Sequence, residues 1–244
     1  MNRCKEKAVV LIPARYESKR FEGKVLAPLC GKPVIEWVYK GAMGSKLADG
    51  IYVVTDSERI KETVEKFGGS VLFRKKHYEC GTDRIADAVK EMDVDIVINL
   101  QGDEPLVKGE ILDELIKVMR EETPKMATLA RKIECEEELN NPNVVKVVCD
   151  KNGFALYFSR ALIPFNATDS IALKHIGIYA FTKNSILEFT SLPKGNLEEV
   201  ERLEQLRALE AGWKIKVLLT THRFIGIDTP EDLKRAEEFI IKKS

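Results

Sequence analysis

The feature that most limits the fold is a regular alternation of short β-branched runs with helical patterns in the first half of the chain. Runs typical of strands lie at residues 8–12, 51–55 and 95–100. Between them, apolar residues recur at i, i+4 and i+7 in segments 60–67 and 85–92, which places each set on one face of a helix. Strands that alternate with helices pair in parallel and are covered on both faces. The sequence therefore predicts an α/β fold with a mostly parallel mixed sheet.

The second half of the chain is less regular. A smaller mixed β element is predicted at about 153–190, and the rest is expected to return to helices and strands. The elements expected after residue 100 are a helix at 109–120, strands at 126–132, 144–148, 154–158 and 177–181, a loop at 163–170, a helix at about 197–211, a strand at 215–219 and a helix that Thr229 caps and Pro230 begins. Because no repeat or Pro/Gly/Ser-rich linker interrupts the chain, we expect a single domain over residues 1–244.

Composition excludes several classes of protein. The 39 basic and 39 acidic residues give zero net charge, which argues against nucleic acid or a membrane surface as a partner and requires any anion site to be local. No apolar run approaches the ~20 residues that span a bilayer, and no signal-like segment follows the polar start, so we expect a cytoplasmic protein. The five cysteines form no C-x-x-C pair and are expected to be reduced.

A basic loop from Pro13 to Lys24 follows the first predicted strand. Ligands of open α/β sheets bind at the carboxyl ends of the strands, so Arg15, Arg20 and Lys24 are candidates for binding phosphate. The loop is not a Walker A motif, because Ser18 replaces the first glycine of that motif. A solvated surface loop is the alternative.

Two acidic segments provide candidate metal ligands. Asp103 follows the predicted strand at 95–100, and Asp228 precedes the last helix. Mg²⁺ is commonly held by one or two carboxylates together with substrate phosphates, so this pair suits a metal-assisted phosphoryl transfer. The alternative is that each residue belongs to the start of a helix.

A third group suits a polyhydroxylated ligand. His175 and Tyr179 are four residues apart, which places both on one face of a strand, and Glu204 and Gln205 follow. A core or interface histidine is the alternative. Separately, Gly81 and Arg84 stand at a predicted helix start that could meet an anion.

These motifs together resemble the 3-deoxy-manno-octulosonate (Kdo) cytidylyltransferase family, in the family's order over nearly the whole chain. The matching segments are residues 12–16 with Ser18, Arg20, Gly23 and Lys24, then 101–105, 157–160, 175–179, 204–207 and 228–233. The sequence departs from the family pattern at Phe165, where tryptophan is frequent, at Cys80, where serine is common, and in a short segment between Arg160 and His175.

The resemblance implies a nucleotide-diphospho-sugar transferase (Rossmann-like) fold, a homodimer that uses the smaller β element, and a reaction of CTP with Kdo that gives CMP-Kdo and diphosphate for lipopolysaccharide biosynthesis. It implies Mg²⁺ on Asp103 and Asp228, with Lys24 and Arg15 also catalytic. The implied nucleotide-binding residues are Pro13, Ala14, Arg15, Arg20, Lys24, Gly81, Arg84 and Gln101, and the implied sugar-binding residues are Arg160, His175, Tyr179, Glu204 and Gln205.

Three other functions remain open at this point. A CMP-sialic acid synthetase shares the fold and chemistry but does not usually carry the segments 101–105 and 228–233 in this form. A sugar-1-phosphate nucleotidylyltransferase has a first loop richer in glycine. A catalytically silent subunit would not need both Asp103 and Asp228.

Overall fold

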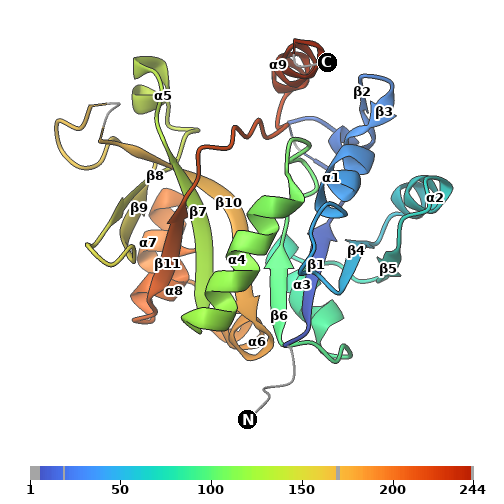
Figure 1. Ribbon diagram of the computed structural model, residues 1–244, viewed down its shortest axis with the longest axis horizontal. Coiled ribbons are helices and arrows are strands. Elements are labelled where there is room, and N and C mark those ends of the chain that lie inside the picture. The colour runs from blue at the N-terminus through green and yellow to red at the C-terminus, as the bar shows by residue number, and fades with distance from the viewer. Residues whose placement is uncertain (1–5, 19, 169–170, 243–244) are drawn as a thin grey trace. The chain divides into compact units, whose positions relative to one another are not determined.

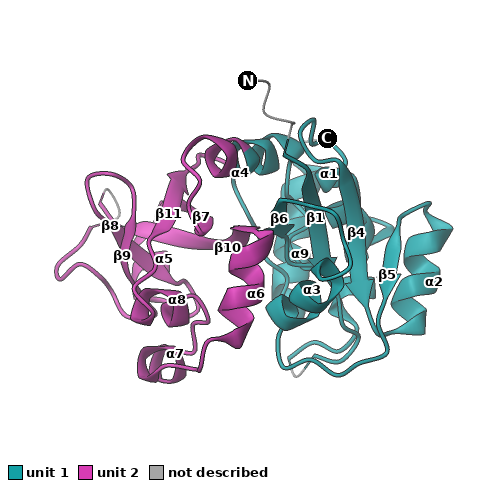
Figure 2. Cartoon of the chain, turned by 90° about the horizontal axis from the view of Figure 1, so that it is seen from below, with its two compact units in different colours: residues 1–116, 223–244 teal, residues 117–222 magenta. Residues whose placement is uncertain are grey.

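The computed structural model describes residues 6–18, 20–168 and 171–242, and the chain divides into two compact units (Figure 2). Unit 1 comprises Met1–Ile116 and Arg223–Ser244, and unit 2 comprises Lys117–His222. The predicted β element at 153–190 falls within unit 2. The prediction of a single domain stays a prediction.

Unit 1 is built on a parallel sheet with the strand order β6-β1-β4-β5 (Figure 1). The strands are β1 (Ala8–Pro13), β4 (Gly50–Thr55), β5 (Val71–Phe73) and β6 (Ile96–Asn99). All six residues of β1 are buried, as expected for a strand that is covered on both faces. The parallel α/β arrangement predicted from the alternating pattern is confirmed.

Helices and a small hairpin complete unit 1. They are η1 (Lys24–Leu26), β2 (Pro28–Leu29), β3 (Lys32–Pro33), α1 (Val34–Ala42), α2 (Glu58–Lys66), α3 (Gly81–Val89), α9 (Pro230–Ile241) and α4 (Gly109–Glu121), which continues into unit 2. Ile60 and Val64 of α2 are fully buried, which confirms the predicted apolar face of that helix. The predicted cap of α9 is also confirmed, because Thr229 and Asp232 form a capping box.

Unit 2 contains a mixed sheet. Strand β7 (Met126–Lys132) pairs in parallel with β11 (Ile215–Leu219) and antiparallel with β10 (Leu173–Thr182). Strand β8 (Lys146–Cys149) pairs antiparallel with β10 and with β9 (Ala155–Ser159). The helices of this unit are α5 (Glu136–Asn140), α6 (Lys183–Ser191), α7 (Asn196–Glu201) and α8 (Leu206–Glu210).

The predicted single helix at 197–211 is wrong, because α7 and α8 are separate helices. Arg202, which follows α7, has a left-handed backbone with φ of 54°. The side chain of Arg160 donates to the carbonyl oxygens of Glu201 and Arg202, so groups from outside the helix satisfy the carbonyls at its end.

The described cysteines are free thiols, as predicted, and Cys4 lies outside the described residues. Within the described part of the chain, no helix is long and apolar enough to cross a membrane.

Candidate active site

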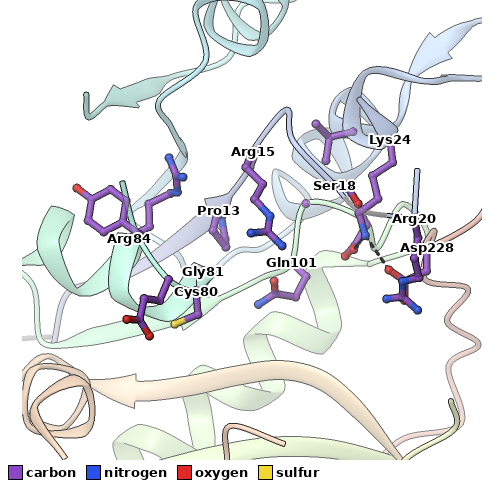
Figure 3. Close-up of a pocket in the computed structure, with 16 residues that line it drawn as sticks. Pro13, Arg15, Ser18, Arg20, Lys24, Cys80, Gly81, Arg84, Gln101 and Asp228 are labelled. Atoms are coloured by element: carbon purple, nitrogen blue, oxygen red, sulfur yellow. Dashed lines mark hydrogen bonds and ion pairs between the residues drawn. The ribbon is translucent and has the colours of Figure 1, made fainter. Parts of the chain in front are cut away.

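A cavity of about 410 Å³ opens in unit 1, next to the residues that follow β1 and β6 (Figure 3). All ten residues that the sequence predicts for nucleotide or metal binding line it, although they come from four separate segments. The lining residues are Pro13, Ala14, Arg15, Ser18, Arg20, Lys24, Val25, Tyr78, Glu79, Cys80, Gly81, Arg84, Gln101, Gly102, Asp103 and Asp228. Lys19, the remaining cation of the basic loop, lies outside the described residues.

One end of this cavity holds a cluster of opposite charges. The Nζ atom of Lys24 donates to Oδ2 of Asp103 and lies 2.8 Å from Oδ1 of Asp228. Arg20 contacts the other oxygen of Asp228 at 2.9 Å. Burial of Lys24 disfavours its charged form, but the two carboxylates outweigh this effect and raise the pKa of the ammonium group. Lys24 is therefore a cation that two convergent carboxylates share.

Close backbone packing brings these segments together. A Cβ atom on Gly102 would lie 3.0 Å from the carbonyl oxygen of Pro13, and one on Gly81 would lie 3.1 Å from Cγ of Pro13. Larger side chains at these glycines would push the loop after β1 away from the turns that carry Asp103 and Arg84.

Arg84 and Tyr78 line another part of the cavity. Arg84 is only 4% exposed, and it pairs with Asp56 at 2.9 Å and stacks over the ring of Tyr78 at 5.0 Å. Its Nη1 atom is buried and has no hydrogen-bond partner among the described residues. A buried cation with an unused donor indicates a site for an acceptor group of a ligand.

A chain of side-chain hydrogen bonds orients Gln101. Thr82 Oγ1 accepts from the amide of Asn99 at 3.1 Å, and Asn99 Oδ1 accepts from Nε2 of Gln101 at 3.0 Å. The carbonyl oxygen of Gln101 is thereby left as an acceptor. Figure 3 shows Gln101 and Arg15 between Arg84 on one side and Lys24, Arg20 and Asp228 on the other. Arg15 is exposed and has no ion-pair partner within the described residues, so it is available to an anion.

The predicted sugar-binding residues all lie in unit 2, and three of them form one cluster. The rings of His175 and Tyr179 are 5.5 Å apart, which confirms that they share a face of β10. The hydroxyl of Tyr179 donates to Oε1 of Gln205 at 3.1 Å. Burial lowers the pKa of His175 to about 3, and burial together with the carboxylate of Glu204 raises the pKa of Tyr179. Both side chains are therefore neutral at pH 7.

Arg160 has a different environment. Its guanidinium donates to the carbonyl oxygens of Glu201 at 2.8 Å, Pro142 at 3.0 Å and Arg202 at 3.5 Å, and its backbone N–H donates to the carboxylate of Glu201 at 2.9 Å. These bonds join three segments of unit 2. A role for Arg160 in sugar binding stays a prediction.

Sequence reasoning missed several residues that support these sites. Tyr78 lines the cavity, Thr128 contacts His175, and the fully buried Lys146 donates to the carbonyls of Asn141 and Arg160. A tyrosine shortly before the Gly81 helix start was an available signal for Tyr78. Thr128 and Lys146 stand within ordinary strand patterns and gave no such signal.

The fold is α/β, and the cavity with its convergent charges lies at the carboxyl ends of parallel strands, where ligands of such sheets bind. A family model described as cytidylyltransferase matches residues 9–215. The chain belongs to this family of nucleotidyltransferases.

Individual relatives agree with this assignment. The 3-deoxy-manno-octulosonate cytidylyltransferase of Thermodesulfovibrio yellowstonii is 50% identical over 94% of this chain and 96% of its own length. The 8-amino-3,8-dideoxy-manno-octulosonate cytidylyltransferase of Shewanella pealeana is 50% identical over 93% and 96%. The solved structure of a CMP:2-keto-3-deoxy-manno-octonic acid synthetase complexed with CTP is 36% identical and covers 98% of this chain and 100% of its own, with a TM-score of 0.91.

Proposed function

We propose that this enzyme transfers the cytidylyl group of CTP to Kdo and releases CMP-Kdo and diphosphate, a step that supplies activated Kdo for lipopolysaccharide. The observation that carries the proposal is the cavity of unit 1, which Arg15, Lys24 and the carboxylates of Asp103 and Asp228 line together. The chain is also similar to a synthetase whose structure was solved in complex with CTP.

The two ends of the cavity suit the two ends of a nucleotide. Arg15 and Lys24 would bind the triphosphate, with Arg20 beside them, because charge-assisted hydrogen bonds are the strongest that phosphate oxygens accept. Gln101 presents its carbonyl oxygen, which suits the amino group of cytosine. Arg84 would bind near the base or ribose through its unused donor.

Asp103 and Asp228 fit a magnesium ion, since their oxygens already converge on a single cation, the ammonium of Lys24. No cluster of three or more His, Cys, Asp or Glu side chains that could hold a metal occurs among the described residues, so phosphate oxygens and water would supply the remaining ligands. A bound ion would neutralise charge on the phosphates and lower the pKa of the attacking hydroxyl.

The proposed chemistry is an in-line attack of the anomeric hydroxyl of Kdo on the α-phosphorus, with diphosphate as the leaving group. It needs no covalent protein nucleophile. Positioning of the substrates and neutralisation of charge by Arg15 and Lys24 would lower the barrier. Arg160, His175, Tyr179, Glu204 and Gln205 would bind the sugar acid.

The decisive experiment measures diphosphate release with each of the four nucleoside triphosphates against Kdo, 8-amino-3,8-dideoxy-manno-octulosonate and sialic acid. We expect turnover with CTP and Kdo. Preference for the 8-amino sugar, which a relative's name includes, would contradict Kdo as the acceptor. Activity only with sialic acid, or none with any pair, would contradict the proposed function.

The metal assignment is tested by Asp103→Asn, which keeps the shape of the side chain but removes its charge. We expect turnover to fall by about 100-fold or more, because one ionised ligand is lost, while the circular dichroism spectrum is retained. Glu22→Gln is the matched control, since it removes an exposed carboxylate from the loop that carries Lys24. Near-normal turnover of Asp103→Asn would overturn the assignment.

We also propose a cytoplasmic homodimer, as the resemblance implies. Exposed apolar side chains of unit 2 support it: Leu156, Phe165 and Ile171 are 62%, 90% and 64% exposed. Light scattering after size-exclusion chromatography should give twice the monomer mass, and Phe165→Asp should shift the mass towards that of the monomer.

A further inference from the structure

Strand β10 pairs irregularly with β7. His175 pairs with Ala130 and Ile176 with Leu129, but the register then shifts, so that Tyr179 is opposite Thr128. The extra length of β10 forms a bulge, and the hydroxyl of Thr128 lies against it. Oγ1 of Thr128 is 3.1 Å from the carbonyl oxygen of Ile176 and 2.9 Å from that of Ile178.

The same hydroxyl is 3.0 Å from Nε2 of His175. A threonine hydroxyl has one hydrogen to donate and two lone pairs that accept, whereas a backbone carbonyl only accepts. Two carbonyls compete for the single hydrogen of Thr128, which is fully buried. The contact with His175 must therefore run the other way, with the ring donating from Nε2–H to Oγ1 of Thr128.

We infer that Thr128 is a positioning residue that fixes His175 in the Nε2–H tautomer, so that Nδ1 is presented as an acceptor to a hydroxyl of the sugar acid. This inference rests on the proposed function. The ring is held from its sides by Phe158, with centroids 5.0 Å apart in an edge-to-face arrangement, and by Tyr179. Nδ1 has no hydrogen-bond partner within the described residues, and His175 keeps part of its surface accessible.

The Nε2 group of Gln205 limits the chemical class of ligand that the cluster can bind. Gln205 is 3% exposed, its oxygen accepts from Tyr179, and its Nε2 group has no hydrogen-bond partner among the described residues. The cluster thus offers a donor, Nε2 of Gln205, and acceptors, which are Nδ1 of His175 and the phenol oxygen of Tyr179. A hydroxyl group both donates and accepts, whereas phosphate and carboxylate oxygens only accept and would leave Nδ1 unused. The cluster therefore favours the polyol part of the sugar acid over its carboxylate.

The tautomer can be read directly from the ¹⁵N shifts of histidine labelled in both ring nitrogens, measured at pH 7 without substrates. The chain has three histidines, so the spectrum of His175→Asn assigns the signals of His175 by difference. We expect Nε2 protonated and Nδ1 unprotonated in the wild type and in Thr128→Ser, which keeps the hydroxyl. Thr128→Val has nearly the same shape but no acceptor, so the share of the Nε2–H form should fall.

Kinetic constants distinguish a positioning role of Thr128 from a general loss of protein structure. In Thr128→Val, KM for Kdo should rise about tenfold, as expected for one weakened hydrogen bond, whereas KM for CTP should change by less than about twofold. Thr128→Ser should restore KM for Kdo. The proposal is overturned by an Nδ1–H form or an imidazolium in the wild type, by an unchanged tautomer and KM in Thr128→Val, or by equal losses for both substrates.

These outcomes are distinct from those of the function test. The spectrum is recorded without substrates, so it reports the tautomer even of a protein that uses another acceptor. Turnover of wild-type protein with CTP and Kdo tests the function without reference to Thr128.

Discussion

At the scale of single residues, Lys24 joins the parts of the cavity that we propose to bind phosphate and metal. Its ammonium holds together Asp103 and Asp228, which are 125 residues apart in the chain and would repel each other without it. The rule that strand ends meet at one sheet edge predicted that Lys24 and Asp103 would lie close together, whereas Asp228 was only paired with Asp103 as a candidate metal ligand. It did not predict that Lys24 would lie between the carboxylates, because that depends on the path of a loop with no regular structure.

Lys24→Met should strengthen binding of Mg²⁺ in the absence of nucleotide and weaken catalysis. Removal of the shared cation leaves two carboxylates free for the metal. The repulsion between a lysine ammonium and a nearby metal ion amounts to several kcal/mol in a partly buried site. We therefore expect Mg²⁺ to bind at least about tenfold tighter. Turnover with CTP and Kdo should fall by about 100-fold, because the triphosphate loses a cation. Isothermal titration with MgCl₂ and the diphosphate assay measure the two effects.

Lys40→Met is the control for that experiment. The exposed Lys40 forms an ion pair with Glu36, and neither residue lines the cavity, so the substitution removes the same charge and a carboxylate contact outside it. It should change neither magnesium affinity nor turnover. Unchanged magnesium binding in Lys24→Met would show that its ammonium does not compete with the metal.

The contacts of Arg160 favour a structural role over a role in sugar binding alone. Three carbonyl groups from residues 142, 201 and 202 already occupy its guanidinium, so Arg160→Met should lower the free energy of unfolding by about 2 kcal/mol. Urea unfolding measures this loss. If Arg160 acts only on the sugar, the stability will be unchanged and only KM for Kdo will rise.

At the scale of secondary-structure elements, periodicity predicted the buried sheet and helices that cover it. One wrong prediction is explained by contacts from outside the helix, and one missed helix by the lack of a start signal. The segment 197–211 has helical character throughout, but the donors of Arg160 end α7 at Glu201. Helix α1 was not predicted. It begins after Pro33 without a side-chain cap, so the usual signal for a helix start is missing.

The cap of α9 links an element to the candidate metal site. The carboxylate of Asp232 accepts from the backbone N–H groups of Asp228 and Thr229, and Thr229 Oγ1 accepts from the N–H of Asp232. Thr229→Ala should therefore lower the free energy of unfolding by about 1 kcal/mol and also raise the Mg²⁺ concentration needed for half-maximal turnover, because the neighbouring Asp228 is held less firmly.

Thr182→Ala is the matched variant, since Thr182 caps α6 by accepting from the N–H of Ser185 at 3.0 Å. It should cost a similar free energy without a change in the magnesium requirement. Equal effects of the two variants on the magnesium requirement would mean that the cap of α9 does not position Asp228.

At the scale of the whole molecule, the two groups of candidate residues belong to different units. The predicted nucleotide and metal ligands lie in unit 1 and the predicted sugar ligands in unit 2. Sequence alone could not delimit these units, because unit 1 is formed from two separated segments and no linker composition marks the points at residues 116 and 223 where the chain crosses. The neutral overall charge predicts that any anion site is local, and Arg15, Arg20 and Lys24 line a single cavity.

The stability of the whole molecule should depend on pH through His175. Its pKa is lowered from 6.5 to about 3 by burial, and its ring faces Thr128, Phe158 and Tyr179, none of which carries a charge at these pH values. Between these two pKa values the unfolded chain binds a proton that the folded protein does not, so stability falls as the pH is lowered through this range. The contribution of His175 is fully present above about pH 6.5.

Urea unfolding at pH 7.5, 6 and 4.5 measures this dependence. From pH 6 to 4.5 the loss attributable to His175 approaches about 1.4 kcal/mol per pH unit, and His175→Gln, which cannot be protonated, should lack this part of the loss. His77→Gln removes an exposed histidine and should retain the dependence of the wild type. The carboxyl groups of Asp87 and Asp232, whose pKa values are lowered from 3.8, add their losses mainly below this range, and the difference between wild type and His175→Gln reports the histidine. If wild type and His175→Gln lose stability equally there, the ring of His175 is protonated in the folded protein, and the neutral tautomer fixed by Thr128 would not exist at those pH values.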